Sequence, residues 1–434
     1  MICVYPRSMP AKTLKELYDD LRMSQGPHQG TPVITSTDDP FVVRLTQLLL
    51  AYGVQIKASD VHLEPTAAGA RIRYRMGGML HEMLQVPVEV RDPLLRSLKV
   101  KAGMTNDPVG RSKPQDSRID VDTEGRKVNF RLSSFPTLFG DVLAIRILDR
   151  AAPILALEQV GFPPAMLKEF QRLIRRPNGL ILVTGPAGSG KTTTLYAALN
   201  TLRSPRIKIV TLEDPVEYQM DGVDQAQINP AIGLTFASGL RAILRQDTNV
   251  ILVGEIRDKE TAEIAVRAAL TGHLVLSTMH TRNSLGASTR LIDMEIEPHL
   301  ILSSVTGVVA QRLVRVPCQC RRADPTAAPT FIRLWTQEIG SPPPETSVAS
   351  LCKGAGCSAC NGTGYHGRLG IFELLVMTDA LKQLILDRAS GHLYQHAAAS
   401  GSLHTMLRDG LEKAAQGLTT MEEILRVTGE SDEP

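Results

Sequence analysis

The middle of the chain alternates short apolar runs with segments long enough for helices. The apolar runs are LILVT at 180–184, KIVTLED at 208–214, VILVGE at 250–255 and HLVLSTMH at 273–280. Strands that are apolar along their whole length are typical of parallel sheets covered by helices on both faces. The pattern therefore predicts an α/β fold with a three-layer core.

Other periodicities flank this core. After a polar stretch at 1–30, which predicts a short helix and a flexible arm, PFVVRLTQLLLAYGVQI has apolar residues at helical spacing, and ARIRYRM and KVNFRLSSF alternate like strands. Residues 31–150 are thus expected to form a small α+β domain. A linker with three prolines follows at 151–164, and the α/β domain occupies 165–434. Its end, at 371–430, is expected to be helical.

Composition narrows the class of protein. A chain of 434 residues fits two or three domains, and its net charge of +3, without a Lys/Arg block, points to no nucleic-acid or lipid partner. The apolar start is interrupted by Pro6 and Arg7, which argues against a signal peptide. No apolar run approaches the roughly 18 residues needed to span a bilayer. We therefore expect a cytosolic protein that reaches a membrane only through a partner.

The clearest chemical signal is a glycine-rich segment between a predicted strand and a predicted helix. It matches G-x4-G-K-[ST], the P-loop that binds nucleotide phosphates through backbone N–H groups. The predicted nucleotide-binding residues are Gly185, Pro186, Ala187, Gly188, Ser189, Gly190, Lys191, Thr192 and Thr193. Lys191 is expected to reach the β- and γ-phosphates of ATP, and Thr192 to bind Mg²⁺. The alternative is a chance glycine-rich turn.

Acidic residues end two of the predicted strands. Glu255 follows VILV about 60 residues after the P-loop, and we interpret it as the general base that polarises the attacking water. Glu213, Asp214 and Glu217 lie in TLEDPVE, where they either orient water and Mg²⁺ or only cap a strand. We assign Glu213 and Glu217 to catalysis.

Two histidines bracket the fourth apolar run. His280 follows its carboxyl end, the edge at which ligands bind in doubly wound sheets, so we expect it to sense the γ-phosphate. His273 precedes the run and is expected to be structural.

The cysteines indicate a second kind of site. They are Cys3, Cys318, Cys320, Cys352, Cys357 and Cys360, five of them within one short stretch. In a reducing compartment such clustering suggests a metal rather than disulfides. Cys-x-x-Cys at 357–360 is half of a structural zinc site, and the pair at 318 and 320 is one residue shorter than usual. Cys352 is a possible substitute ligand, and a remnant without metal is the alternative.

Taken together, these segments resemble the ATPases of type II secretion and type IV pilus assembly. The resemblance covers about residues 40–430. It rests on the P-loop and on ASDVHLEP, TLEDPVEY, LRQDTNVILVGEIRDKETAEIAVRAALTGHLVLSTMHT, QRLVR and GYHGRLGIFELL. It implies a PAS-like N-terminal domain, a RecA-like ATPase core with a cysteine-rich insertion at 316–366, and a homohexamer.

The same resemblance implies functions for residues that would otherwise look like ordinary strand charges. Arg131 and Arg146 match family arginines that reach the phosphates from the N-terminal domain. Departures from the family are RMGG at 75–78, QDSR at 115–118 and the shortened cysteine pair.

The resulting hypothesis is an ATP-driven motor at the cytoplasmic face of the inner membrane. It would assemble pilin or pseudopilin subunits, with an inner-membrane platform protein as partner. The cysteine insertion favours assembly or secretion over retraction, and the short N-terminus favours a pilus system. Two alternatives are a DNA-translocating ATPase, disfavoured by the 4% aromatic content, and a nucleotide-gated switch that hardly hydrolyses ATP.

Overall fold

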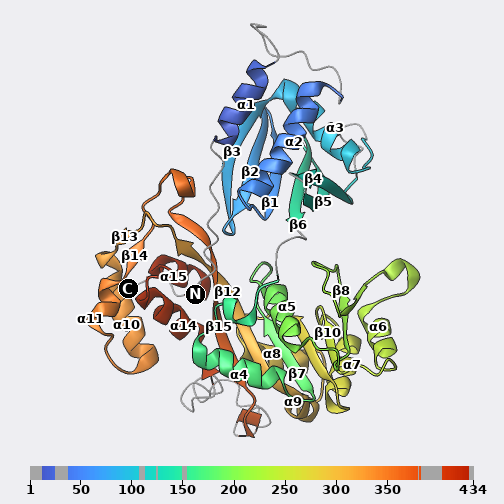
Figure 1. Cartoon of the computed structure of the whole chain (residues 1–434), viewed down its shortest axis with the longest axis vertical. Helices are drawn as coiled ribbons and strands as arrows, with labels where there is room; N and C mark the ends of the chain where they lie inside the picture. Colours follow the sequence, from blue (N-terminus) through green and yellow to red (C-terminus); the bar gives the residue numbers. More distant parts are fainter. Residues whose placement is uncertain are drawn as a thin grey trace. The chain divides into compact units, whose positions relative to one another are not determined.

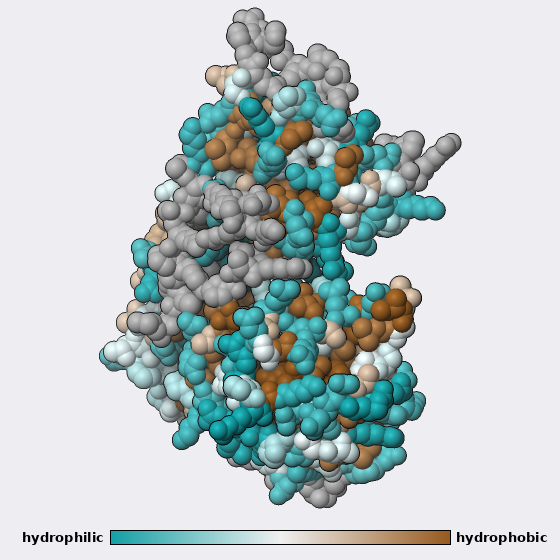
Figure 2. Space-filling model, turned by 45° about the vertical axis from the view of Figure 1, so that its right-hand side comes forward, coloured by the Kyte–Doolittle hydropathy of each residue, from teal (hydrophilic) through white to brown (hydrophobic). Residues whose placement is uncertain are grey.

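The computed structural model describes residues 12–24, 38–106, 113–123, 126–148, 154–379, 381–382 and 403–429. Its contacts divide the chain between Ala152 and Pro153 into two compact units (Figure 1). No described helix is both long and apolar enough to cross a membrane. On the face drawn in Figure 2, hydrophilic side chains surround smaller apolar patches.

The N-terminal unit is a six-stranded antiparallel sheet in the order β3-β2-β1-β6-β5-β4. Its strands are β1 (Asp60–Thr66), β2 (Gly69–Met76), β3 (Met79–Pro87), β4 (Gln115–Thr123), β5 (Arg126–Thr137) and β6 (Gly140–Leu148). Its helices are α1 (Leu14–Met23), α2 (Pro40–Gln55) and α3 (Val88–Lys101). Alternation in the strands gives the sheet one apolar face, which packs with the helices, and one polar face. The predicted α+β organisation is confirmed.

The N-terminal stretch contains the short helix that the sequence predicts, α1, but this helix is docked and does not belong to a flexible arm. Leu14 and Tyr18 are buried, and the Tyr18 ring meets Phe41 of α2 edge-on with centroids 5.9 Å apart. Thr13 and Glu16 cap the helix reciprocally. The physical reason is an apolar stripe at helical spacing, which needs a partner surface to be buried. Most of the remaining arm lies outside the described residues.

The C-terminal unit is built on an eight-stranded sheet in the order β16-β15-β12-β7-β11-β10-β8-β9. Its strands are β7 (Gly179–Thr184), β8 (Ile209–Glu213), β9 (Asp224–Gln227), β10 (Val250–Val253), β11 (Leu274–Met279), β12 (Val305–Pro317), β15 (Tyr365–Val376) and β16 (Leu403–His404). Pairing is parallel from β12 to β9, as the apolar runs predicted, and antiparallel at β15 and β16.

Helices cover both faces of this sheet. One apolar cluster joins it to α4 (Pro164–Ile174) and α5 (Lys191–Leu202). A second cluster joins the other face to α6 (Phe236–Ile243), α7 (Lys259–Leu270), α8 (Leu285–Asp293) and α9 (Pro298–Ser304). Successive β7 residues alternate between the clusters, which is how a wholly apolar strand serves two layers. The predicted three-layer core is confirmed.

Two predicted boundaries differ from the structure. Residues 157–162, placed in the linker, pack into the core of the C-terminal unit, where Phe162 stacks on Phe170 and Phe372 with centroids 5.1 and 4.0 Å apart. Residues 371–376, expected to be helical, belong to β15, because β12 offers a free edge for pairing. Neither partner is local in sequence, so the local pattern could not reveal it.

The C-terminal end forms a separate layer beside β12 and β15. It comprises α10 (Ala328–Ile339), α11 (Glu345–Ala349), α14 (Met406–Ala415) and α15 (Met421–Thr428), with a two-stranded ribbon of β13 (Arg322–Ala323) and β14 (Cys352–Lys353). Buried charges fasten it to the sheet. Glu423 accepts hydrogen bonds from Arg315 of β12 and from Arg426. Burial alone would raise the pKa of Glu423, but these hydrogen bonds outweigh it and lower the pKa to about 2.

We predict that Glu423→Gln lowers the free energy of unfolding by about 3 kcal/mol at pH 7, from the difference between the folded pKa and the ordinary 4.5. Because the folded pKa is depressed, this stabilisation is present above pH 4.5 and declines as the pH falls towards 2. Urea unfolding followed by Trp335, the chain's one tryptophan, measures it, because that ring packs in this layer. The exposed neighbour Glu422→Gln is the control. Equal midpoints for wild type and Glu423→Gln at pH 7 would contradict the assignment.

Candidate nucleotide site and cysteine cluster

The P-loop lies between β7 and α5, as its sequence predicted. Gly190 caps α5 in the left-handed conformation, with φ of 88°, which favours glycine. Gly185 is required for space, since a Cβ there would come within 2.5 Å of the Gln311 carbonyl oxygen. Within the described part of the chain, the Thr184 and Ser189 hydroxyls are buried without a hydrogen-bond partner. A helix N-terminus with free donors suits an anionic phosphate group.

Lys191 lies almost buried in the loop. Its Nζ donates to the carbonyl oxygens of Gly185 at 2.8 Å and Pro186 at 2.9 Å. The pKa of Lys191 is lowered to about 8. Burial is the main cause, the positive charge of Arg312 adds to it, and the carboxylate of Glu255 opposes it. A desolvated cation is a strong partner for a phosphate oxygen. Thr192, in the first turn of α5, is half-buried and could provide a magnesium ligand.

Glu255 and His280 meet at the carboxyl edge of the sheet, as expected. Glu255 lies just beyond β10 with 13% of its side chain exposed, and His280 lies beyond the neighbouring β11. His280 Nε2 is 3.7 Å from Glu255 Oε2, and Arg257 Nε is 2.5 Å from the same oxygen. His273 is at the other end of β11, where its Nδ1 lies 3.1 Å from the Ala268 carbonyl oxygen.

Glu213 is enclosed by hydrogen-bond donors. It is 3% exposed and accepts from Tyr196 of α5, from Thr211 at 2.6 Å and from Gln225 at 3.2 Å. Burial and this carboxylate raise the pKa of Tyr196 well above its usual value. These bonds hold α5 to β8, which suits a supporting function. The backbone N–H of Glu217 approaches the same tyrosine hydroxyl at 3.4 Å. Catalysis by Glu213 and Glu217 stays a prediction.

Gln311 and Arg312 lie beside the P-loop, and no function was predicted for either from the sequence. Gln311 is buried against the loop, and the Arg312 guanidinium donates to the carbonyl oxygens of Gln311 at 3.0 Å and Arg282 at 2.7 Å. Burial lowers the pKa of Arg312. Arg312 thus ties β12 to the segment that carries His280. The QRLVR motif was the available signal, but its meaning depends on the pairing of β12 with β7.

Arg131 and Arg146 lie on the polar face of the N-terminal sheet. They are directly opposite each other on β5 and β6, and the row continues to Arg118 on β4 and to Asp60 on β1. Asp60 pairs with Arg146 at 3.2 Å and with Arg75 of β2 at 3.4 Å. Directly opposed residues share a face of a sheet. The row therefore combines four guanidinium groups with one carboxylate.

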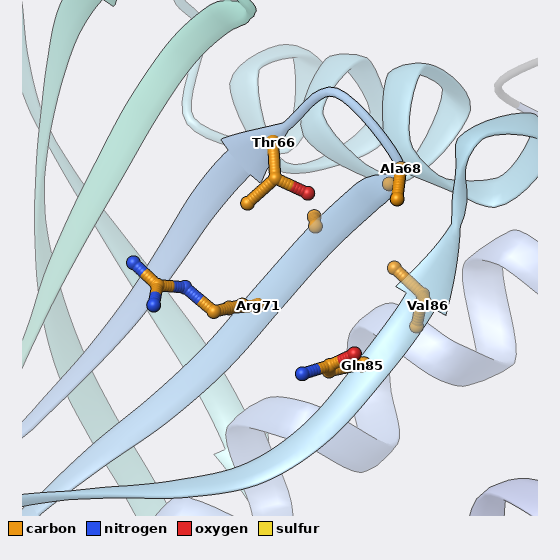
Figure 3. Close-up of a pocket in the computed structure, with 7 residues that line it drawn as sticks. Thr66, Ala68, Arg71, Gln85 and Val86 are labelled. Carbon is orange, nitrogen blue, oxygen red and sulfur yellow. The ribbon is translucent and has the colours of Figure 1, made fainter.

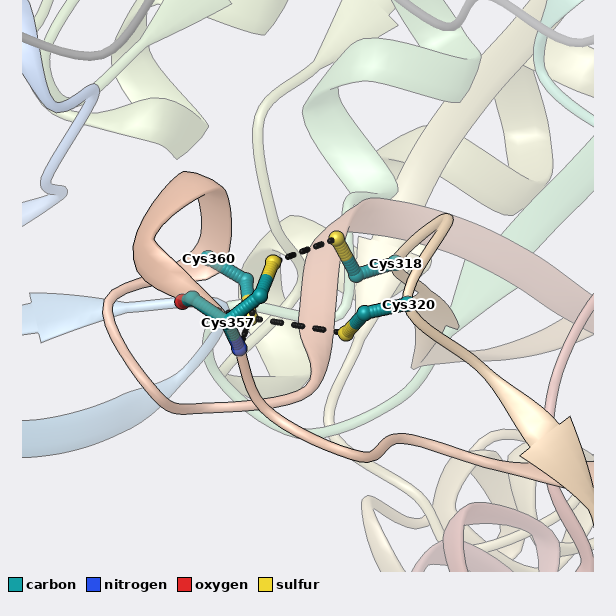
Figure 4. A group of neighbouring side chains, drawn as sticks. All are labelled: Cys318, Cys320, Cys357 and Cys360. Carbon is teal, nitrogen blue, oxygen red and sulfur yellow. Dashed lines mark hydrogen bonds between the residues drawn. The ribbon is translucent and has the colours of Figure 1, made fainter.

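Four cysteines come together at the base of the C-terminal layer (Figure 4). Their sulfurs all lie within 4.8 Å of one another in the group Cys318, Cys320, Cys357 and Cys360. The pairs 318–357 and 320–360 are 3.9 Å apart, and 357–360 are 3.7 Å apart. Such a group can hold a metal ion. Cys352 is not among these four, so its use as a substitute ligand is wrong.

The backbone around these thiols differs from one to another. Burial favours the neutral form of Cys360, but N–H groups of Cys357 and Gly364, each 3.1 Å from its sulfur, lower its pKa to about 7. Burial raises the pKa of Cys318 to about 11. A thiolate that accepts two N–H bonds is a good metal ligand. Cys3 lies outside the described residues.

A small open pocket of about 170 Å³ lies in the N-terminal unit (Figure 3). It is lined by Thr66, Ala68, Gly69, Ala70, Arg71, Gln85 and Val86. Arg71, its one charged residue, is 3.2 Å from Glu64. The pocket contains none of the predicted site residues, and we assign it no ligand.

The P-loop, its buried lysine and an acidic residue at the same sheet edge define a P-loop ATPase. The sequence profile of the family described as "Type II/IV secretion system protein" matches residues 35–426, and the chain belongs to this family. It is 44% identical over 403 residues to type II secretion system ATPase E of Vibrio cholerae, covering 93% of this chain and 78% of that protein. Identity to type II secretion system protein E of Pseudomonas aeruginosa is 44% over 394 residues, covering 91% and 76%.

Solved structures agree with the fold. The pilus retraction motor PilT with bound ADP aligns with a TM-score of 0.58 and 26% identity, over 88% of this chain and 95% of that one. The Legionella pneumophila ATPase DotB aligns with a TM-score of 0.67 and 19% identity, over 93% and 98%, and shows the fold alone. The recognition of a secretion ATPase from the sequence is thus confirmed.

Proposed function

We propose that this ATPase powers the assembly of pseudopilin subunits in a type II secretion system. It works as a homohexamer on the cytoplasmic side of the inner membrane, with a PAS-like N-terminal domain and a RecA-like core. It binds an inner-membrane platform protein, contacts the membrane only peripherally and needs no nucleic acid. The relatives named above favour secretion over a pilus system, the other choice that the sequence allowed.

The observation that carries the proposal is the placement of two residues at the carboxyl edge of one parallel sheet: Lys191 in the P-loop that follows β7, and Glu255 just beyond β10. In the proposed mechanism the residues 185–193 bind the ATP phosphates, and Lys191 neutralises charge at the β- and γ-phosphates. Glu255 accepts a proton from the water that attacks the γ-phosphate in line. His280, beside Glu255, senses whether that phosphate is present. Mg²⁺, when bound at Thr192, supplies further charge neutralisation.

We expect Glu255→Gln to bind ATP normally but to hydrolyse it about a hundredfold more slowly, because the amide cannot accept the proton. Lys191→Ala should lose nucleotide binding as well. Phosphate release and the binding of a fluorescent ATP analogue separate the two effects. Glu263→Gln, an exposed carboxylate on α7, is the matched control. Near-normal hydrolysis by the Glu255 variant would remove this residue from the mechanism.

The arginine row supports a second part of the mechanism. Arg131 and Arg146 are proposed to act on the phosphates from the N-terminal domain, since a planar guanidinium neutralises charge on the transferred phosphoryl group. Arg146 is paired with Asp60 and still has most of its side chain exposed on the sheet face.

Alanine at Arg131 or Arg146 should reduce ATP turnover by at least about tenfold. This threshold is deliberately low, because an arginine that reaches the transferred phosphoryl group can contribute about a thousandfold or more. The hexamer, measured by light scattering after size-exclusion chromatography, should persist. Arg71→Ala changes an arginine on the same face outside the row and should leave turnover unchanged. Wild-type turnover by both row variants would show that neither arginine acts on ATP.

We further propose that Cys318, Cys320, Cys357 and Cys360 bind one structural Zn²⁺. Zinc–sulfur bonds of about 2.3 Å in a tetrahedron place sulfurs about 3.8 Å apart. The separations of 3.7 and 3.9 Å between three of the sulfur pairs support this. Four protein ligands leave no open position for catalysis, so the ion would stabilise the insertion.

Elemental analysis should find about one zinc per chain. Cys357→Ser combined with Cys360→Ser should abolish it, because half of the thiolates are lost. Cys352→Ser is the matched control and should retain the metal. Nucleotide binding should persist in the double variant. A double variant that keeps its zinc, or a wild type purified without chelator that has almost none, would exclude the site.

A further inference from the structure

Gln311 is a buried amide directly beside the P-loop. It is 2% exposed and lies one residue beyond Ala310, which pairs with Thr184 at the end of β7. Its Nε2 donates to the Ser189 carbonyl oxygen at 2.7 Å, and its Oε1 accepts from the Thr194 hydroxyl at 2.8 Å. One side chain therefore spans from the P-loop to the first turns of α5.

The bond to Ser189 fixes the orientation of a peptide group. A trans peptide is planar, with its C=O and N–H pointing in opposite directions. Because the Ser189 carbonyl points at Gln311, the N–H of Gly190 points away from it. That N–H is one of the donors at the N-terminus of α5.

The loop also packs closely on its Gln311 side. A Cβ on Gly190 would come within 2.8 Å of Gln311 Nε2, whereas a Cβ on Gly188 would meet nothing within 4 Å. The side facing β12 is thus filled, and a phosphate can approach only from the other side. The Gly190 N–H points to that side.

We propose that Gln311 is a positioning residue that aims the Gly190 N–H at the nucleotide phosphates. This inference rests on the proposed ATPase function. Without the bond from Gln311, the Ser189–Gly190 peptide is free to rotate, and ordering it would oppose nucleotide binding. The alternative is a purely structural amide that joins β12 to α5 through Thr194.

The two halves of the amide can be tested separately. Gln311→Met keeps the length of the side chain but removes both bonds, and Thr194→Val removes only the bond to α5. We expect Gln311→Met to weaken binding of fluorescent mant-ADP with Mg²⁺ about tenfold, the scale of one hydrogen bond. Thr194→Val should change the Kd less than about threefold. Gln311→Asn, whose shorter amide cannot reach Ser189, should behave like Gln311→Met and serves if the methionine variant fails to fold.

Thr419→Val is the control for a merely structural effect. Its hydroxyl donates to the Arg315 carbonyl on the same strand at 2.9 Å, away from the P-loop. This variant should lower the Tm without changing the Kd for mant-ADP. A Kd within twofold of wild type for Gln311→Met or Gln311→Asn, or equal weakening by Thr194→Val, would overturn the inference. If wild type itself failed to bind mant-ADP, the proposed ATPase function would fail instead.

Discussion

The parallel pairing of β12, β7, β11 and β10 is the constraint on which the nucleotide site depends. Parallel strands in register bring their carboxyl ends to one edge. The P-loop, Glu255 and His280 each follow a different strand, and Gln311 lies in β12 just beyond its last residue paired with β7, so pairing alone gathers residues that are far apart in the sequence. Helices on both faces bury the paired strands, whereas the carboxyl edge remains available for polar side chains.

Buried charged groups at that edge and in the C-terminal layer are held by hydrogen bonds rather than left to solvent. Glu213 has three donors and Glu423 has two arginines, whereas Lys191 rests on loop carbonyl oxygens. A buried charge is costly unless it is paired, so each network also fixes the elements that contribute to it. Lys191 differs because neutral carbonyl groups accept from two of its three N–H donors and do not balance its charge. Its environment therefore favours exchange of these carbonyls for an anion.

Much of this arrangement could be predicted from the sequence, and the rest depends on distant partners. The wholly apolar runs identified the parallel strands, and the P-loop and Glu255 followed from motifs at their ends. The docking of α1 on Phe41, the stacking of Phe162 on Phe372 and the pairing of β15 with β12 could not be read locally, because each partner is remote in sequence. Gln311 was missed for the same reason. The hydrogen-bond donors that enclose Glu213 come from α5 and β9, so they too could not be read from the local sequence.

Strand β12 carries Gln311 against the P-loop and leads directly into Cys318 of the cysteine cluster. The insertion that follows starts at Cys318 and Cys320 and ends at Cys357 and Cys360, so the cysteine cluster holds its two ends together. Residues between 311 and 318 must therefore keep their number, since one residue more or less would turn alternate side chains to the opposite face. The exposed turn at 340–344, between α10 and α11, is under no such limit, because lengthening a loop whose ends are fixed costs little entropy. At this turn a reporter domain can be inserted without disturbing the nucleotide site.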